Sequence, residues 1–438
     1  MTGHVPGGTR FASALRAAGP ERVGSVAAAV GLGLDVAGLD GAVGDLLTVG
    51  DGPRRAAAQI VASRPGSVTC MTLAGAAAHP VGTPVRRSLT PPAVPVGPGL
   101  LGRVIDGLGR PIDGLGDLPA HAEVPLGNSA PGPLARARIA SPLQLGVRAL
   151  DTLVATGRGQ RLGLFAGSGV GKSSLLSMIA RGTAAEVSVI ALIGERGREV
   201  REFIEDDLGA EGLARSVVVV STSDEPALMR LRAALVATRI AEWFRDGGAD
   251  VMLMMDSLTR VAMAQREIGL SAGEPPATRG YPPSTFSTLA GLLERAGTAS
   301  TGSITGIYTV LVDGDDHNEP IADAARSILD GHVVLDRTLA TTGHFPSIDV
   351  LASISRLAST VTAPDRLADA TRLRSVLAAR RSAQDLLDVG AYRAGANPLV
   401  DAALRAQTAI DAFLRQRMDE RSTADSAWQA LRELTESF

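Results

Sequence analysis

Residues 163–174 read Gly163-Leu164-Phe165-Ala166-Gly167-Ser168-Gly169-Val170-Gly171-Lys172-Ser173-Ser174. An apolar segment precedes this glycine-rich stretch, and residues 175–180 follow it with a helical pattern. The stretch fits the pattern GxxxxGK[ST], with Ala166 at the position of the first glycine. Glycines let backbone N–H groups curve around an anion, and a helix N-terminus adds partial positive charge. The sequence therefore predicts a strand, a phosphate-binding loop and a helix, with Gly167, Ser168, Gly169, Val170, Gly171, Lys172, Ser173 and Ser174 around the phosphates.

The lysine of this loop stands out in the composition of the chain. Among 43 lysine and arginine residues there is one lysine, Lys172. A compact, flexible ammonium group reaches β- and γ-phosphate oxygens, and a planar guanidinium does not replace it there. The hydroxyl of Ser173, next in sequence, is placed to ligate Mg²⁺. Lysine at this position alone favours a nucleotide site over a chance glycine-rich turn.

The composition is that of a folded chain with a large core. The 438 residues suggest roughly two to four domains. The net charge of −3 argues against a broadly basic surface for nucleic acid. The one cysteine, Cys70, excludes an internal disulfide and is expected to be a small buried hydrophobic residue. No apolar run approaches a membrane span, no secretory signal begins the chain and the six histidines lack metal-ligand spacing, so we expect a soluble, cytoplasmic protein without a histidine metal cluster.

The chain is expected to divide into four parts. Residues 1–20 contain a short helical pattern with Phe11 and Leu15 on one side, which is either a frayed terminus or an arm that docks on a partner or membrane. Residues 21–92 alternate short apolar segments with glycine turns and suggest a small β-barrel. Residues 93–362 form the catalytic part, and residues 363–438 are helical.

The middle of the chain alternates apolar strands with longer helical patterns. Near-continuous apolar runs are typical of a parallel sheet that helices cover on both faces. The sequence thus predicts an α/β fold. The expected strands are residues 161–165, 187–193, 217–221, 251–255 and 306–312. After residue 362, helices are expected over 365–387, up to Phe413 and near Trp428.

Two carboxylates follow predicted strands. Asp256 ends an apolar strand some 80 residues after the loop, as does the aspartate that holds Mg²⁺ beside such loops. Glu195 follows the strand 187–193, where a carboxylate can orient a water for attack on the γ-phosphorus. The alternative for Glu195 is a solvated charge paired with Arg196 or Arg198, and spacing alone does not separate the two.

Several stretches together resemble the flagellar type III export ATPases, which are related to the catalytic subunits of rotary ATPases. The resemblance runs from about residue 95 to 415, and before residue 90 it is architectural only. Its motifs are residues 157–173, 194–204, 254–260, 273–284 and 315–323.

This resemblance implies a RecA-like P-loop core with an N-terminal β-barrel and a C-terminal helical domain. It also implies a homohexameric ring that uses ATP and Mg²⁺ to energise protein export. In the family pattern Lys172, Glu195 and Arg356 are catalytic, and Arg356 reaches the neighbouring subunit's nucleotide. Ser173 and Asp256 serve the metal, and Phe345 stacks on adenine. Arg356 could instead be an internal ion-pair partner and Phe345 a core residue.

The resemblance also implies partners and leaves rivals. A coiled-coil stalk protein is expected at residues 390–398, with a stator-like regulatory subunit, export chaperone–substrate complexes and the membrane export gate as further contacts, and no nucleic acid. A virulence-type secretion ATPase has the same chemistry, although residues 318–320 favour the flagellar type. A ring helicase would need an RNA-binding domain, yet Phe11 is the one aromatic among the first 90 residues. Glu195 argues against a non-catalytic nucleotide-binding subunit.

Overall fold

A computed structural model describes residues 22–438 except 75–78, 89, 120 and 313–318. The expected docking arm, residues 1–20, and residues 315–318 of the last family motif lie outside the described residues. The described chain forms two compact units. One comprises the residues up to Pro92 with Ser271–Gly273, and the other comprises Ala93–Leu270 and Glu274–Phe438.

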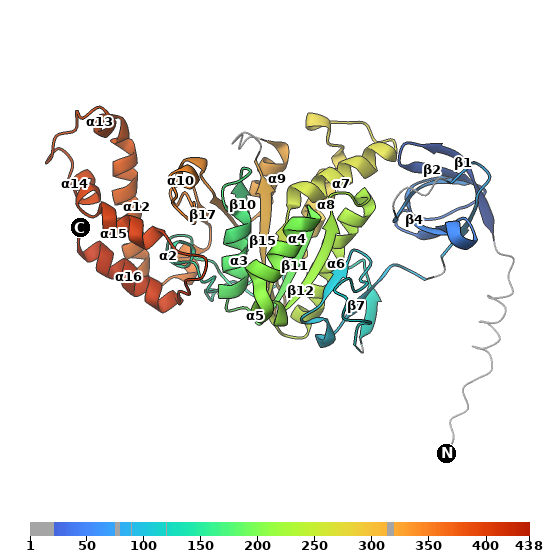
Figure 1. Ribbon diagram of the computed structural model, residues 1–438, viewed down its shortest axis with the longest axis horizontal. Helices are drawn as coiled ribbons and strands as arrows, with labels where there is room; N and C mark the ends of the chain where they lie inside the picture. Colours follow the sequence, from blue (N-terminus) through green and yellow to red (C-terminus); the bar gives the residue numbers. More distant parts are fainter. Residues whose placement is uncertain (1–21, 75–78, 89, 120, 313–318) are drawn as a thin grey trace, which may run out of the picture. The chain divides into compact units, whose positions relative to one another are not determined.

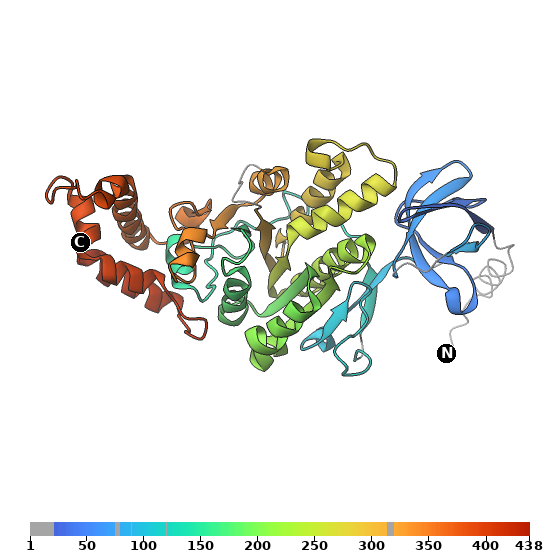
Figure 2. The same cartoon turned by 45° about the horizontal axis from the view of Figure 1, so that its top comes forward.

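The first unit is a closed β-barrel, as the glycine-turn rhythm predicts (Figures 1 and 2). Its strands are ordered β1-β2-β5-β4-β3-β6, and β6 pairs with β1 to close it. Alternate residues such as Val36, Ile60 and Val85 fill the interior. Cys70 is buried among them, as expected. The strands are β1 (Val23–Val30), β2 (Gly33–Ala37), β3 (Leu46–Val49), β4 (Ala56–Arg64), β5 (Ser67–Thr72) and β6 (Pro84–Arg87).

The second unit is built on a nine-stranded sheet in the order β17-β16-β10-β15-β13-β11-β12-β8, with β14 beside β15. Neighbours from β16 to β8 run parallel, β17 pairs antiparallel at one edge, and β14 pairs antiparallel with the start of β15. All five predicted strands are present. The strands are β8 (Val104–Asp106), β10 (Arg161–Ala166), β11 (Val187–Glu195), β12 (Ser216–Thr222), β13 (Asp250–Asp256), β14 (Gly297–Thr298), β15 (Ser303–Leu311), β16 (Gly331–Val334) and β17 (Ile354–Ser355). A separate pair joins β7 (Ala93–Val96) and β9 (Ala122–Pro125).

Helices cover both faces of this sheet, which explains its continuous apolar strands (Figure 1). In β11, Val189 and Ala191 face one buried cluster with α6 and α8, while Ile190 and Leu192 face another with α3. The α- and π-helices of this unit up to residue 361 are α2 (Arg148–Leu153), α3 (Lys172–Gly182), α4 (Gly197–Glu202), the π-helix η3 (Phe203–Leu208), α5 (Gly209–Ala214), α6 (Ala227–Asp246), α7 (Leu258–Ser271), α8 (Pro283–Glu294), α9 (Pro320–Ile328), α10 (Arg337–Thr341) and α11 (Ala358–Val361).

The C-terminal helices pack on the α3 side of the sheet. Leu373, Phe413 and Leu431 share one buried cluster with Leu150 of α2 and Ile179 of α3. The helix predicted over 365–387 is interrupted, because Ala383 has non-helical backbone angles. The helices are α12 (Pro364–Ser382), α13 (Gln384–Asp388), α14 (Pro398–Arg405), α15 (Gln407–Leu414) and α16 (Ala424–Glu436).

The fold class is therefore as predicted, with an N-terminal barrel, an α/β core and C-terminal helices. In the part of the chain that the structure describes, every helix is too short or too polar to cross a membrane.

Candidate nucleotide site

The glycine-rich loop connects β10 to α3. Gly169 and Gly171 adopt φ of +76° and +92°, in the left-handed region that glycine tolerates best. A Cβ on Gly171 would also lie 3.3 Å from the ring of Phe345. Ala166, in contrast, is a buried residue of β10 whose carbonyl accepts from Val312 N–H at 3.1 Å. The methyl group is tolerated because this position belongs to the strand and not to the turn.

Lys172 lies between the two carboxylates that the sequence singles out. Its Nζ donates to Asp256 Oδ1 at 2.6 Å and to Glu195 Oε1 at 3.4 Å. Glu195 and Asp256 end β11 and β13, which are neighbouring parallel strands, so both carboxylates reach the same edge of the sheet. Thr309 on β15 donates to Asp256 Oδ1 at 2.7 Å and fixes the carboxylate. The structure thus brings together three residues that are up to 84 positions apart.

Burial and charge act against each other at this site. Burial lowers the pKa of Lys172, but the charges of Asp256 and Glu195 outweigh it, so the pKa is raised. Burial raises the pKa of Glu195, the charge of Asp256 adds to this, and Lys172 opposes it. Lys172 is therefore a firmly protonated cation, and Glu195 holds a proton more tightly than an exposed glutamate.

The alternative ion pairs for Glu195 are not formed. Arg196 pairs with Glu199 at 3.0 Å, and Arg198 pairs with Glu202 at 2.9 Å. Each pair joins two residues that are one helical turn apart, at the start of α4 or within it. Glu195 instead points toward Lys172, so its carboxylate belongs to the loop site.

A cavity of about 100 Å³ lies beside the loop, lined in part by Ser173, Glu195 and Asp256. Hydroxyl and carboxylate oxygens are ligands that Mg²⁺ prefers, and this ion usually keeps several waters and takes further oxygens from phosphates. Ser173 and Asp256 therefore fit the magnesium ion that such sites use. Among the described residues, no group of three or more His, Cys, Asp or Glu side chains is arranged to hold a metal by itself.

Phe345 lies beside the loop and is 46% exposed, so it is not the core residue that the alternative interpretation requires. Its segment is tied to the loop, since Ser347 Oγ donates to the carbonyl of Val170 at 2.6 Å. Arg337 also donates to the carbonyl of Ser168 at 3.3 Å. Sequence reasoning missed Ser347 and Arg337, because neither belongs to a recognisable pattern.

Arg356 follows β17 and is exposed. Its guanidinium donates to the carbonyl of Arg326 at 3.2 Å. Within the described part of the chain it forms no ion pair, so the expected alternative of an internal ion-pair partner is not observed. No hydrogen bond links it to the carboxylates around its own Lys172 in the same residues.

Comparison with known proteins accounts for this architecture. Residues 146–355 match the nucleotide-binding domain of the ATP synthase alpha/beta family, and residues 362–433 match the C-terminal domain of the T3SS EscN ATPase. The chain is 49% identical over 418 residues to the flagellum-specific ATP synthase of Bacillus subtilis (strain 168), covering 95% of each protein.

Solved structures agree with the sequence matches. Assembled EscN from the enteropathogenic E. coli type III secretion system superposes with a TM-score of 0.89 at 42% identity, covering 94% of this chain and 100% of that one. Assembled EscN in complex with its central stalk EscO gives a TM-score of 0.87 at 41% identity, with the same coverage. The chain belongs to the family of flagellum-specific ATP synthases and type III secretion ATPases, and it is an ATP-hydrolysing enzyme.

Proposed function

We propose that this chain hydrolyses ATP with Mg²⁺ in a homohexameric ring and thereby energises flagellar type III protein export. The observation that carries the proposal is the contact of Lys172 with Asp256 and Glu195 at the mouth of the phosphate-binding loop. A lone lysine, held between two carboxylates at a helix N-terminus, has the charge and reach to contact transferring phosphates.

The residues in and around the loop have different tasks in this proposal. Backbone N–H groups of residues 167–174 bind the phosphates, and Lys172 neutralises the β- and γ-phosphate oxygens. Ser173 and Asp256 would hold Mg²⁺, Asp256 through water. When bound, the ion neutralises charge that develops on the phosphate oxygens. Phe345 presents a ring face on which adenine can stack, and stacking needs no hydroxyl.

Glu195 serves the attacking water. Its carboxylate accepts a hydrogen bond from the water and turns the oxygen toward the γ-phosphorus. A bond forms from that oxygen to phosphorus, the bond from phosphorus to the bridging oxygen breaks, and ADP leaves with the bonding electrons. The water proton passes to Glu195 or to an oxygen of the inorganic phosphate that forms. Arg356 of a neighbouring subunit would stabilise the charge on the transferring group.

The single lysine allows a direct test of the site. An amine-reactive reagent should modify the α-amino group first, because the raised pKa keeps Lys172 protonated and slow to react. Inactivation should follow the second, slower modification, at Lys172, and MgATP should protect against it. Peptide mass spectrometry and ATPase assays at alkaline pH measure both steps. Full ATPase activity after complete labelling of Lys172 would contradict the assignment.

The ring and its partners are proposed on the likeness to assembled EscN, which has been solved with its central stalk. A coiled-coil stalk protein would contact residues 390–398, which include exposed glycines and follow α13. Residues 1–20 would dock a stator-like regulatory subunit. Export chaperone–substrate complexes and the membrane export gate would complete the assembly, with the chain cytoplasmic and peripheral to the membrane. The domains of this proposal are the barrel at residues 21–92, the catalytic domain at residues 93–362 and the helical domain at residues 363–438.

The export role is tested by deleting the gene in its own host. We expect loss of flagella and of motility, and restoration by the parent gene but not by Glu195→Gln at equal protein level. The virulence-type alternative has the same catalytic site and is represented by EscN. Normal flagella in the deletion strain, with loss of another secreted protein set, would favour that alternative.

A further inference from the structure

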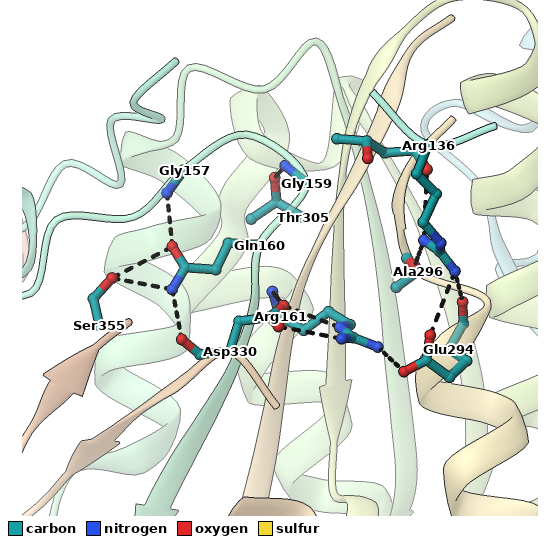
Figure 3. A network of polar contacts seen from close by, with 11 residues as sticks. Arg136, Gly157, Gly159, Gln160, Arg161, Glu294, Ala296, Thr305, Asp330 and Ser355 are labelled. Carbon is teal, nitrogen blue, oxygen red and sulfur yellow. Dashed lines mark hydrogen bonds and ion pairs between the residues drawn. The ribbon is translucent and has the colours of Figure 1, made fainter. Parts of the chain in front are cut away.

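Gln160 is a completely buried amide whose hydrogen bonds are all used (Figure 3). Its Oε1 accepts from the N–H of Gly157 at 2.8 Å. Its Nε2 donates to Asp330 O and to Ser355 Oγ, both at 3.0 Å. The N–H of Gly157 requires an acceptor, so the orientation of the amide is fixed. Gln160 therefore joins three separate segments of the chain.

Two of these partners hold the backbone of Arg356. The N–H of Arg356 donates to Asp330 O at 3.0 Å, the same carbonyl that Gln160 contacts. Ser355, the preceding residue, also donates its hydroxyl to Ala155 O at 2.7 Å. Strand β17 has two residues and pairs with the sheet only at Ile354 and Ser355. So short a ladder gives the segment little support, and the side-chain contacts of Gln160 and Ser355 add to it.

The frame beneath this contact is an ion-pair chain. Arg161, next to Gln160, contacts Asp330 through Nε at 3.0 Å and Glu294 of α8 through its other arm at 2.6 Å. The N–H of Arg161 also donates to the Asp330 carboxylate at 3.0 Å. Figure 3 shows both arms of Arg161 in these contacts. Arg161 thus holds the Asp330 carboxylate through both its backbone and its side chain, and the Asp330 carbonyl is a fixed acceptor for the N–H of Arg356.

The position of Gln160 separates it from its own phosphate-binding loop. Gln160 precedes β10, and the loop follows the strand at its other end. Six strand residues span about 20 Å, which exceeds the reach of any side chain. The contacts of Gln160 therefore act on Arg356 and not on the phosphates of its own subunit.

We propose that Gln160 is a positioning residue that fixes the backbone of residues 354–356 and aims Arg356 at the neighbouring subunit's nucleotide. This inference rests on the proposed in-trans role of Arg356. A change at Gln160 then slows hydrolysis in the neighbouring site and leaves ATP binding in its own site intact.

The first test is the steady-state kinetics of assembled full-length rings. Gln160→Met keeps the length of the side chain and removes its donors and acceptor. We expect kcat to fall on the order of 10²-fold with KM for ATP unchanged, because a misplaced arginine is lost mainly in the transition state. Ser355→Ala is a smaller change that removes only the hydroxyl, and it should also lower kcat. The test therefore does not depend on the folding of Gln160→Met alone.

Mixed rings then decide where Gln160 acts. Gln160→Met subunits retain Glu195, and Glu195→Gln subunits retain a well-placed Arg356, so their mixture contains complete sites and should regain activity. Mixing Gln160→Met with Arg356→Ala should give no gain, since both damage the arginine. The opposite result, rescue by Arg356→Ala and not by Glu195→Gln, would place Gln160 in its own loop site and overturn the inference.

Two controls separate this inference from the proposed function. Thr305→Val removes the Oγ1 that accepts from the N–H of Gly159, the residue before Gln160, at 2.8 Å. This contact does not involve residues 354–356, so the variant should retain most activity. A mixture of Glu195→Gln and Arg356→Ala must regain activity, or the in-trans role fails and this inference with it. If that mixture is active, two results would refute the role of Gln160 while the in-trans role of Arg356 stands. These are an unchanged kcat in Gln160→Met, and rescue by neither partner in confirmed mixed rings.

Discussion

Arg356→Ala rings should bind MgATP with normal affinity and hydrolyse it about 10³–10⁵-fold more slowly than the parent rings. The loss is large because an arginine that neutralises the transferring phosphoryl group acts in the transition state. Binding should survive because the loop, Lys172 and Mg²⁺ hold the nucleotide in this proposal, while Arg356 acts on charge that develops in the transition state. Fluorescent-nucleotide titration and steady-state ATPase assays on sized rings measure the two quantities separately.

Complementation shows whether the arginine works across the subunit boundary. Rings that mix Arg356→Ala with Glu195→Gln contain sites that combine an intact Glu195 with an intact Arg356. Neither parent ring contains such a site, so the mixture should be more active than either variant. Arg326→Lys is a matched control, since it keeps the backbone carbonyl that Arg356 contacts. Mutant-level activity in mixed rings verified by differential tags would refute the in-trans role.

The sequence predicted the loop site because its parts leave local signals. A glycine-rich turn between an apolar strand and a helix is visible without a structure, and so is an apolar strand that ends in Asp256. Spacing alone leaves Glu195 open between a water-orienting role and a pair with Arg196 or Arg198, and the family resemblance favours the first. The structure adds that β11 and β13 are neighbours, which brings Glu195 and Asp256 to one edge of the sheet, and no local pattern contains that information.

Contacts between distant short segments were beyond sequence reasoning. Strands β8 and β17 have three and two residues, too few for a periodic pattern. The break at Ala383 has no glycine or proline to announce it. Gln160 lies within a family motif, residues 157–173, but its hydrogen bonds to Asp330 and Ser355 span 170 and 195 positions. Such roles follow from tertiary structure, and only the identity of the residue is local.

Glu195→Gln should retain ATP affinity and lose most of its turnover. The amide has the shape of the carboxylate and can still contact Lys172, but it cannot accept the water proton. Loss of one negative charge beside Lys172 should leave ATP binding equal or stronger, because Lys172 then interacts with fewer competing carboxylates. Asp256→Asn is the informative comparison, since it removes a charge from the same cluster and should weaken Mg²⁺ binding, so that more Mg²⁺ is needed for activity.

The pH dependence distinguishes a water-orienting carboxylate from a structural one. Burial and the charge of Asp256 raise the pKa of Glu195, so its deprotonated form is lost at a higher pH than that of an exposed glutamate. In the parent enzyme kcat should therefore decline as pH falls through this raised pKa, and the residual kcat of Glu195→Gln should lack that decline. If affinity falls together with rate, or the acidic limb persists in Glu195→Gln, then Glu195 holds the site together and another group serves the water.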